Sequence, residues 1–203
     1  MKSSTAEITP ILGTAMDGGF YAGRIKIGDQ DFALIVAPKD QGEHEDTKWI
    51  GDYKDVPNAL SWNDGQANTA AMAEAGSELA KWATDLSIDG YTDWYLPSQD
   101  ELEIIYRNLK PTSNENSRWA RSGINLSAIE PTRPYTATAP AKTQAEAFQE
   151  GGEQAFDTTW YWTSTQHAST TGSAWFQYFY DGFQDYYGKG SELRARAVRR
   201  LPI

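Results

Sequence analysis

Residues 174–187 hold eight aromatic side chains in fourteen positions, the densest aromatic stretch of the chain. They are Trp175, Phe176, Tyr178, Phe179, Tyr180, Phe183, Tyr186 and Tyr187. Tyrosine and tryptophan offer large, rigid contact surfaces at low entropic cost, and the glycines and aspartates between them let the backbone adapt. The chemistry indicated is therefore non-covalent recognition. The alternative is a buried aromatic cluster, and strand alternation buries some rings in either case, so we expect a mixed stretch with several rings displayed.

Residue types that support catalysis or metal binding are sparse. The chain has no cysteine, which excludes disulfides, thiolate metal sites and cysteine nucleophiles. The two histidines, His44 and His167, lack the helical spacing of a metalloprotease site. Phosphate-binding loops, dinucleotide fingerprints and serine-nucleophile motifs are absent, and no carboxylate pair stands out from the acidic background. We therefore predict a protein that is not an enzyme and that uses no metal or other cofactor.

The charge of the chain limits its partners. A formal net charge of −10 argues against duplex nucleic acid or an anionic membrane. One basic cluster stands out, formed by Arg194, Arg196, Arg199 and Arg200. Because it lies on an expected last strand, ion pairs with acidic residues explain it better than phosphate binding. Residues 1–7 show no signal peptide and no run approaches membrane-spanning length, so we expect a protein made in the cytoplasm, without membrane insertion.

The first half of the chain must supply elements that position the aromatic segment. Apolar and β-branched residues flank Gly28-Asp29-Gln30, which predicts a β-hairpin over residues 20–37. Residues 38–57 are polar, and we expect a loop, or a loop with one short strand. Residues 64–86 predict a helix capped by Asp64. Its expected apolar stripe consists of Ala67, Ala71, Ala75, Leu79, Trp82 and Leu86. A capping box from Ser98 to Glu101 predicts a second helix, which ends at Pro111.

The second half is expected to be irregular at first and then β-rich. Residues 112–140 show no sustained period and predict an irregular surface segment. Thr143-Gln144-Ala145-Glu146 is a further capping box, predicted to open a short helix that ends at Gly151-Gly152. Strand-like segments follow at residues 160–165, 174–180 and 193–201. This order predicts one α+β domain over residues 1–203, with a β-rich part at 1–57 that could serve attachment, a core at 58–203 and a binding segment at 174–193.

Three phrases occur in an order that resembles the Lcl C-terminal domain family. They are Asp93-Trp94-Tyr95-Leu96-Pro97-Ser98, then Tyr161-Trp162-Thr163-Ser164-Thr165, then Ala174-Trp175 running on to Arg194-Ala195-Arg196-Ala197-Val198-Arg199-Arg200. The resemblance covers most of the chain from about the first helix onward. It implies a C-type lectin-like fold, shared with formylglycine-generating enzyme, with two main helices, an N-terminal β-hairpin and C-terminal antiparallel strands. The activity of that enzyme is excluded, because it requires cysteines with copper and fold does not carry function.

The C-terminal segment also resembles the variable region of proteins diversified by retroelements, in which mutagenesis at template adenines rewrites AAC and AAT codons. That resemblance implies that ligand-binding residues stand where such codons can change. They are Phe176, Tyr178, Tyr180, Asp181, Phe183, Asp185, Tyr186, Tyr187 and Ser191, with Gly188 and Gly190 between them. The invariant scaffold would be Trp175, Gln177, Phe179, Gly182, Gln184 and Lys189. The alternative is an undiversified family member with one fixed aromatic surface.

This division yields a geometric prediction. Trp175 and Phe179 should be buried. Four tyrosines should share one exposed face: Tyr178, Tyr180, Tyr186 and Tyr187.

The leading functional hypothesis is a binding module for a cell-surface protein or glycan. In its diversified form it would belong to a phage or prophage and act at the tail tip of the virion in host attachment; otherwise it would lie in the bacterial cytoplasm, or reach the surface by an unseen route. A second hypothesis is structural, with the aromatic residues joining copies into a homo-oligomer such as a trimer. A third is an enzyme of unrecognised chemistry, which would need a pocket lined by groups with perturbed pKa values.

Overall fold

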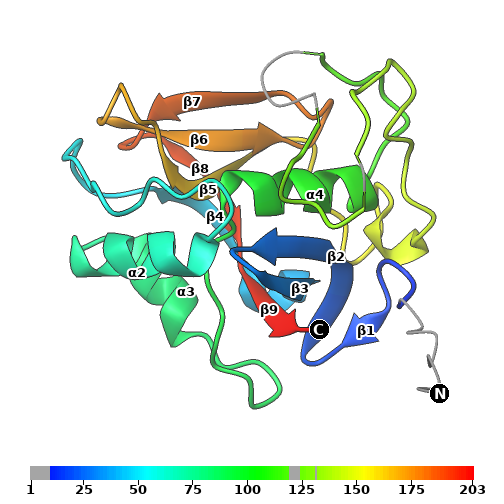
Figure 1. Ribbon diagram of the computed structural model, residues 1–203, viewed down its shortest axis with the longest axis horizontal. Coiled ribbons are helices and arrows are strands. Elements are labelled where there is room, and N and C mark those ends of the chain that lie inside the picture. The colour runs from blue at the N-terminus through cyan, green and yellow to red at the C-terminus, as the bar shows by residue number, and fades with distance from the viewer. Residues whose placement is uncertain (1–9, 119–123, 131) are drawn as a thin grey trace.

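The computed structural model describes residues 10–118, 124–130 and 132–203, which form an α+β fold with two sheets and four α-helices (Figure 1). The strands are β1 (Ala15–Met16), β2 (Gly19–Ile27), β3 (Gln30–Val36), β4 (Glu43–Lys48), β5 (Trp160–Gln166), β6 (Ser173–Tyr178), β7 (Gln184–Gly188), β8 (Glu192–Arg196) and β9 (Val198–Pro202). The helices are α1 (Lys39–Gly42), α2 (Gly65–Glu74), α3 (Glu78–Asp85) and α4 (Gln99–Leu109), with a 3-10 turn, η1, at Glu146–Phe148. The α+β class is confirmed, and the arrangement is consistent with the fold that the family resemblance implies. The prediction about residues 1–7 lies outside the described residues.

The four-stranded sheet has the order β1-β2-β3-β9 and joins the two ends of the chain. The predicted hairpin is confirmed, because Ile27 pairs with Gln30 and leaves Gly28 and Asp29 as the turn. Gly28 has φ +60°, a left-handed conformation that glycine adopts without steric cost. Strand β9 then pairs with the other side of β3, with Val198 opposite Val36.

The five-stranded sheet has the order β4-β8-β5-β6-β7. Strand β5 runs parallel to β8, and the other neighbours are antiparallel. Residues 184–188, which sequence reasoning left without an element, form its edge strand. The single strand predicted over residues 193–201 is divided, because Ala197 exchanges backbone hydrogen bonds with Ala37 and Gly42. The chain therefore passes from one sheet to the other at Ala197.

The helix predicted over residues 64–86 is two helices. Asp64 caps the first, as predicted, by accepting a hydrogen bond from Ala67 N–H at 3.1 Å. Gly76, at φ +96°, then reverses the chain, and Ser77 caps the second helix by accepting from Ala80 N–H at 3.2 Å. The expected alanine stripe is also wrong for α2. Its buried residues are Gly65, Asn68, Thr69 and Met72, whereas Ala67 is exposed.

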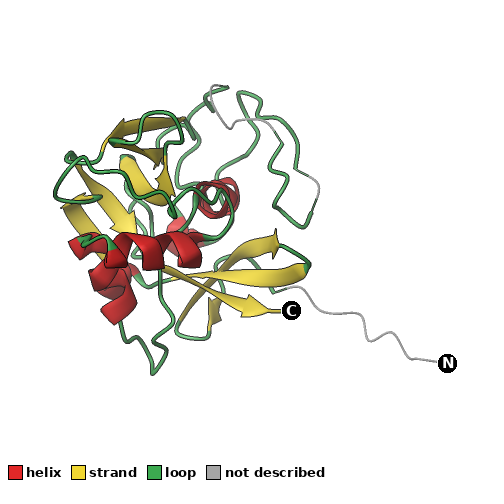
Figure 2. Ribbon diagram, turned by 60° about the vertical axis from the view of Figure 1, so that its left-hand side comes forward, coloured by secondary structure: helices red, strands yellow, loops and turns green. Residues whose placement is uncertain are grey.

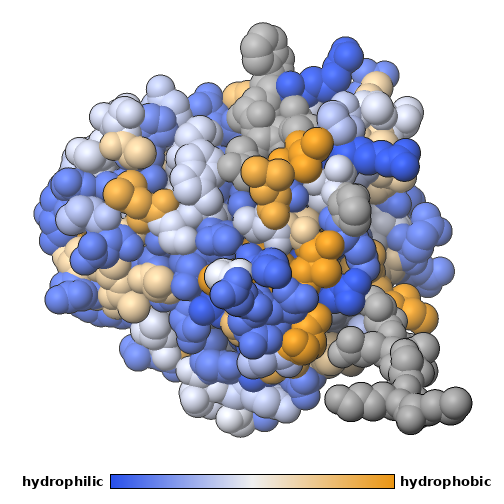
Figure 3. All heavy atoms as spheres, viewed as in Figure 1, coloured by the Kyte–Doolittle hydropathy of each residue, from blue (hydrophilic) through white to orange (hydrophobic). Residues whose placement is uncertain are grey.

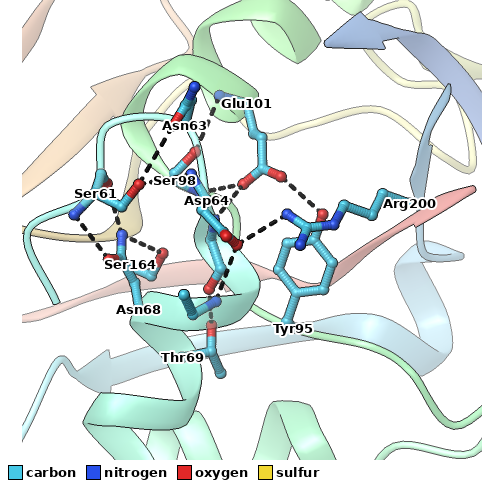
Figure 4. Close-up of polar contacts among 12 residues, drawn as sticks. Ser61, Asn63, Asp64, Asn68, Thr69, Tyr95, Ser98, Glu101, Ser164 and Arg200 are labelled. Carbon is cyan, nitrogen blue, oxygen red and sulfur yellow. Dashed lines mark hydrogen bonds and ion pairs between the residues drawn. The ribbon is translucent and has the colours of Figure 1, made fainter. Parts of the chain in front are cut away.

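Helix α4 is confirmed, with both hydrogen bonds of the predicted capping box formed between Ser98 and Glu101. The Glu101 carboxylate does more than cap its own helix. It also accepts hydrogen bonds from Gly65 N–H, in the first turn of α2, at 3.1 Å and from the Tyr95 hydroxyl at 2.7 Å (Figure 4). Burial raises the pKa of Glu101. One buried carboxylate therefore fixes the starts of both helices.

The first and last family phrases lie against each other. Asp93 pairs with Arg199 at 2.7 Å, and Tyr95 forms a β-bridge with Val198. Arg200 reaches Asp64 at 2.9 Å, also visible in Figure 4. The start of α4 is thereby tied to β9.

The segment between α4 and β5 differs in one respect from the sequence prediction. Its described residues in the range 112–140 contain no helix or strand, as predicted. The capping box predicted at residues 143–146 is wrong, because Thr143 accepts a hydrogen bond from Ala145 N–H and only the single turn η1 follows. The Thr143 side chain thus holds a local turn that competes with a longer helix.

Helix α4 lies between the two sheets (Figures 1 and 2). The largest buried cluster contains α4 residues such as Leu102 and Tyr106, together with Leu34 of β3 and Tyr161 of β5. A second cluster joins α2 and α3 to the five-stranded sheet through Trp49, Met72 and Trp162. Among the described residues, no helix is long and apolar enough to span a bilayer.

Candidate ligand-binding surface

Strands β6 and β7 carry most of the aromatic segment at the free edge of the five-stranded sheet (Figure 1). In their register Trp175 lies opposite Tyr186, and Ala174 lies opposite Tyr187. Paired residues project from the same face of a sheet, and neighbours along a strand project from opposite faces. The aromatic segment is therefore divided between two faces.

The first face carries a group of rings that we call the Trp160 cluster. It consists of Trp160, Phe176, Tyr178, Tyr180, Phe183 and Tyr187. Phe176 stacks on Trp160 with a centroid distance of 4.8 Å, and Tyr187 meets Trp160 edge-on at 5.6 Å. Phe176 is buried at 3% exposure and forms the base, whereas Trp160, Tyr180 and Tyr187 are 36%, 45% and 48% exposed.

The opposite face carries the Trp175 cluster, which consists of Trp62, His167, Trp175 and Tyr186. His167 lies 4.0 Å from Tyr186 and 5.3 Å from Trp175, between ring centroids. Trp62, from the segment before α2, lies 5.8 Å from Trp175. Trp62 and Tyr186 are each 41% exposed. This cluster is thus a second, smaller aromatic surface.

Two geometric predictions need correction. The four tyrosines do not share one face, because Tyr186 projects on the side opposite Tyr187. Trp175 is half-buried rather than buried, whereas Phe179 is fully buried as predicted. Phe176, expected among the displayed residues, is a core residue. Trp175 and Phe176 thus have the reverse of their predicted order of burial. Strand alternation explains this, since neighbouring residues of β6 project from opposite faces and Phe176 projects towards the core.

The polar residues predicted for binding hold the local backbone. Asp181 accepts a hydrogen bond from Phe183 N–H at 3.0 Å, which fixes the turn between β6 and β7. Asp185 accepts from Tyr186 N–H at 2.9 Å on the edge strand. Ser191 donates its N–H to the Gly188 carbonyl at 2.9 Å and is half-buried. Each of these side chains remains partly exposed.

The predicted scaffold residues are held by specific partners. Gln177 donates to the Gly182 carbonyl at 2.8 Å, across the turn. Gln184 and Gln99 exchange two hydrogen bonds of 3.2 and 3.3 Å, which ties β7 to the start of α4. Phe179 stacks on Phe156 with a centroid distance of 4.0 Å. These contacts give each of these scaffold side chains a specific partner in the fold.

Lys189 is the most unusual scaffold residue, because its ammonium group is buried. It donates to the Lys54 carbonyl and the Gln166 side chain, and it lies 4.5 Å above the Trp49 ring. Desolvation by burial lowers the pKa of Lys189 to about 8, although Asp55 and Asp52 oppose the shift. The contacts fasten the 49–58 segment to the end of the aromatic segment.

The burial pattern supports the division between scaffold and displayed residues. Of the eleven positions predicted to vary, ten are at least partly exposed, and Phe176 is the exception. Of the six predicted scaffold positions, five are buried, and Trp175 is the exception. Segment 175–191 thus alternates between fixed and displayed side chains.

Sequence reasoning missed three residues of the aromatic surface. Trp160 was predicted only as the start of a strand, and in the structure it starts β5 and lies beside the outer end of β6, opposite Tyr178. Trp62 and His167 are distant from the segment in sequence and join it only through the fold. The strand order was the missing signal, because it places Trp160 next to the segment.

The four C-terminal arginines are paired, as predicted. Arg194 pairs with Glu43 at 3.0 Å, Arg199 with Asp93, and Arg200 with Asp64. Arg196 lies 3.6 Å from Glu43 and donates to two backbone carbonyls. No group of three or more histidine and carboxylate residues arranged to hold a metal ion occurs within residues 10–118, 124–130 and 132–203.

Comparison with known proteins places the chain in a family. No curated protein matches the chain. A family model does match it, over residues 49–199, from the buried Trp49 to the arginine that pairs with Asp93. The matched region includes both clusters, the first two phrases and the third phrase as far as Arg199, and it covers well over half of the sequence. The chain therefore belongs to the Lcl C-terminal domain family.

Proposed function

We propose that this protein is a non-enzymatic binding module that presents the Trp160 cluster to a glycan or protein on a cell surface. The observation that carries the proposal is the alternation of fixed and displayed side chains along segment 175–191. Rings with their bases packed and their edges exposed lose little entropy on binding, which is the character of interface hot spots. Family membership fits a binding module and leaves the ligand open.

The roles of the buried carboxylates also favour recognition over catalysis. Buried carboxylates such as Glu101 and Glu43 are occupied in holding the fold, through helix caps and arginine pairs. The face in Figure 3 is mostly hydrophilic, with apolar residues in small separate patches. The exposed aromatic rings of the Trp160 cluster are the features that a macromolecular ligand would contact.

The finer proposal is that segment 174–193 is diversified and that the protein acts in phage attachment. Its support is the coincidence between positions that adenine-directed mutagenesis can change and positions that are exposed. A reverse-transcriptase gene beside a near-copy of the C-terminal coding segment, differing only at adenines, would establish it. A neighbourhood without these elements would leave a fixed-sequence binding domain.

Binding is tested with labelled protein on a printed array of bacterial surface polysaccharides and on whole bacterial cells. Treating the cells with protease or with periodate separates protein ligands from glycans. The variant with Tyr178, Tyr180 and Tyr187 changed to alanine should lose binding and remain folded, with a lower melting temperature because Tyr178 packs partly against the second core cluster. The matched control is Leu126→Ala, an apolar residue 88% exposed and outside the cluster. Equal binding by both variants would contradict the proposal.

The alternative hypothesis is that the aromatic residues join copies of the chain into an oligomer. Light scattering of the same variants distinguishes it from the binding proposal. If the Trp160 cluster joins copies of the chain, the wild type is an oligomer and the triple variant dissociates. If the cluster meets an outside ligand, the variant keeps the oligomeric state of the wild type while losing cell binding. The two results distinguish an assembly surface from a receptor-binding surface.

A further inference from the structure

A cavity lies between β2, α4 and the described residues 128–130 and 132–133, and arginine side chains line it. It has a volume of about 230 Å³, and Arg24, Arg107 and Arg133 line it together with Asn108, Glu130 and Thr132. Glu130 lines the cavity and Glu103 pairs with Arg107 behind it, so three guanidinium groups stand against two carboxylates, a local excess of one positive charge in a chain whose net charge is −10. Such a concave positive site attracts anions.

The walls of this cavity are fixed by the backbone. A β-bulge lies between Tyr21 and Gly23, directly before Arg24. Gly23 has φ +137°, and a Cβ there would lie 2.5 Å from the Asn108 amide, so glycine lets α4 approach β2 at this point. Bulges of this kind redirect the side chains that follow them. On the far side, Ala128 forms a β-bridge with Ile25.

The three arginines differ in how they are engaged. Arg107 is held by Glu103 through bonds of 3.0 and 2.6 Å and by the Arg133 carbonyl at 2.9 Å. It is therefore a fixed wall. Among the described residues, the Arg24 side chain pairs at its outer end with Glu130, and it is 22% exposed against 72% for Glu130. Its Nε–H is buried and has no hydrogen-bond partner within the described part of the chain.

A buried donor without an acceptor is costly, and a guanidinium group offers Nε–H and Nη–H side by side. A planar or tetrahedral oxyanion matches that edge with two parallel hydrogen bonds. Glu130 is exposed enough to move aside, so it acts as an internal competitor. We propose that this cavity binds a small oxyanion, a carboxylate or phosphate group, through Arg24, with Arg133 at the rim and Arg107 as a fixed positive wall.

The site is independent of the aromatic surface, since none of its lining residues belongs to either aromatic cluster. The group that it binds could belong to a free ion or to an acidic sugar. Calorimetric titration of the full chain with glucuronate, acetate and inorganic phosphate distinguishes these sources. Methyl glucoside is the neutral control. We expect saturable binding of at least one anion and none of the neutral sugar.

Variants test whether Arg24 makes the contact. Arg24→Gln should weaken binding by about tenfold or more, because a charge-assisted pair is lost. Arg24→Lys should weaken it nearly as much, since an ammonium group cannot form the two parallel bonds. Glu130→Gln should strengthen binding a few-fold by removing the competitor. The matched control, Lys26→Gln, removes a charge from an exposed position of the same strand and should change affinity by less than about twofold.

Two results would overturn the proposal. The first is the absence of binding by all three anions to the wild type. The second is an equal loss in Lys26→Gln and Arg24→Gln, which would indicate diffuse attraction rather than a site. If Arg24→Gln fails to fold, Glu130→Gln decides the question, because unchanged affinity there contradicts the competition.

Discussion

Two kinds of side chain alternate along the aromatic segment, and they differ in what holds them. Phe179 and Gln184 meet partners in α4, and Gln177 meets the Gly182 carbonyl in the turn between β6 and β7, so each has a specific contact in the fold. Tyr180 and Tyr187 chiefly contact other rings of the Trp160 cluster. The difference indicates that the fold depends on the scaffold residues, whereas the displayed tyrosines are available to contact a ligand. Variants at neighbouring positions can break or sharpen this comparison.

The largest expected effect comes from the neighbouring pair Phe179 and Tyr180. Phe179→Ala removes a ring that packs against Phe156, Tyr106 and Tyr161 and should reduce the free energy of unfolding by about 3–5 kcal/mol. Tyr180→Ala should change it by less than about 0.5 kcal/mol, because the ring is exposed. Urea denaturation measures both values. Similar losses in the two variants would abolish the distinction between scaffold and displayed residues.

The turn between β6 and β7 gives the next effect. Gly182 has φ +81°, and a Cβ there would lie 2.4 Å from the Tyr106 ring. Gly182→Ala should therefore reduce stability by about 2–3 kcal/mol, through backbone strain and the clash together. Gly151 has φ +82° with open space around it, so Gly151→Ala carries only the backbone strain of about 1 kcal/mol. Equal losses of stability in the two variants would show that the Tyr106 ring moves aside without an energetic penalty.

The two faces of the β6–β7 edge provide a test on binding. Under the proposed function, Tyr187→Ala should weaken binding to cells by about tenfold, the usual loss for a hot-spot aromatic residue. Tyr186→Ala removes a similar exposed area from the opposite face and should have a much smaller effect. Titration of labelled cells with each variant measures the difference. A larger loss in Tyr186→Ala would move the binding surface to the Trp175 cluster.

Local signals in the sequence were sufficient for several elements. The Gly28-Asp29 turn, the Asp64 cap and the Ser98 capping box were all predicted correctly, because each depends on residues a few positions apart. The same logic failed at Thr143, where a local turn competes with the helix, and at residues 64–86, where Gly76 and Ser77 end one helix and start another.

The errors at the candidate site arose from long-range structure. Which side of β6 faces the core depends on β5 and on α2 and α3, and the sequence of the segment contains no record of it. The segment alone therefore could not show that Phe176, and not Trp175, is the buried residue. Likewise, Trp160 and Trp62 join the aromatic surfaces only through strand order and the position of the segment before α2. The residue types were sufficient to indicate recognition. The assignment of each aromatic residue to one face of the sheet required the fold.

A pH-dependent effect on stability concerns Lys189, the scaffold residue whose charge is buried. Its pKa is about 8 in the folded protein because of desolvation, whereas an unfolded chain keeps the ordinary value of about 10.4. Below pH 8 both states are protonated. Between these two pKa values the unfolded state binds more protons, so the contribution of Lys189 to stability rises with pH, by up to about 3 kcal/mol over the whole interval.

Urea denaturation of the wild type and of Lys189→Met, at pH values from 7 to about 10, isolates this contribution, because the other titrating groups are common to both proteins. The wild type should gain stability relative to the variant as the pH rises through this window. A difference that stays constant would mean that Lys189 keeps its ordinary pKa. In that case its ammonium group would be solvated rather than enclosed by Trp49 and Gln166, and Lys189 would belong with the displayed side chains.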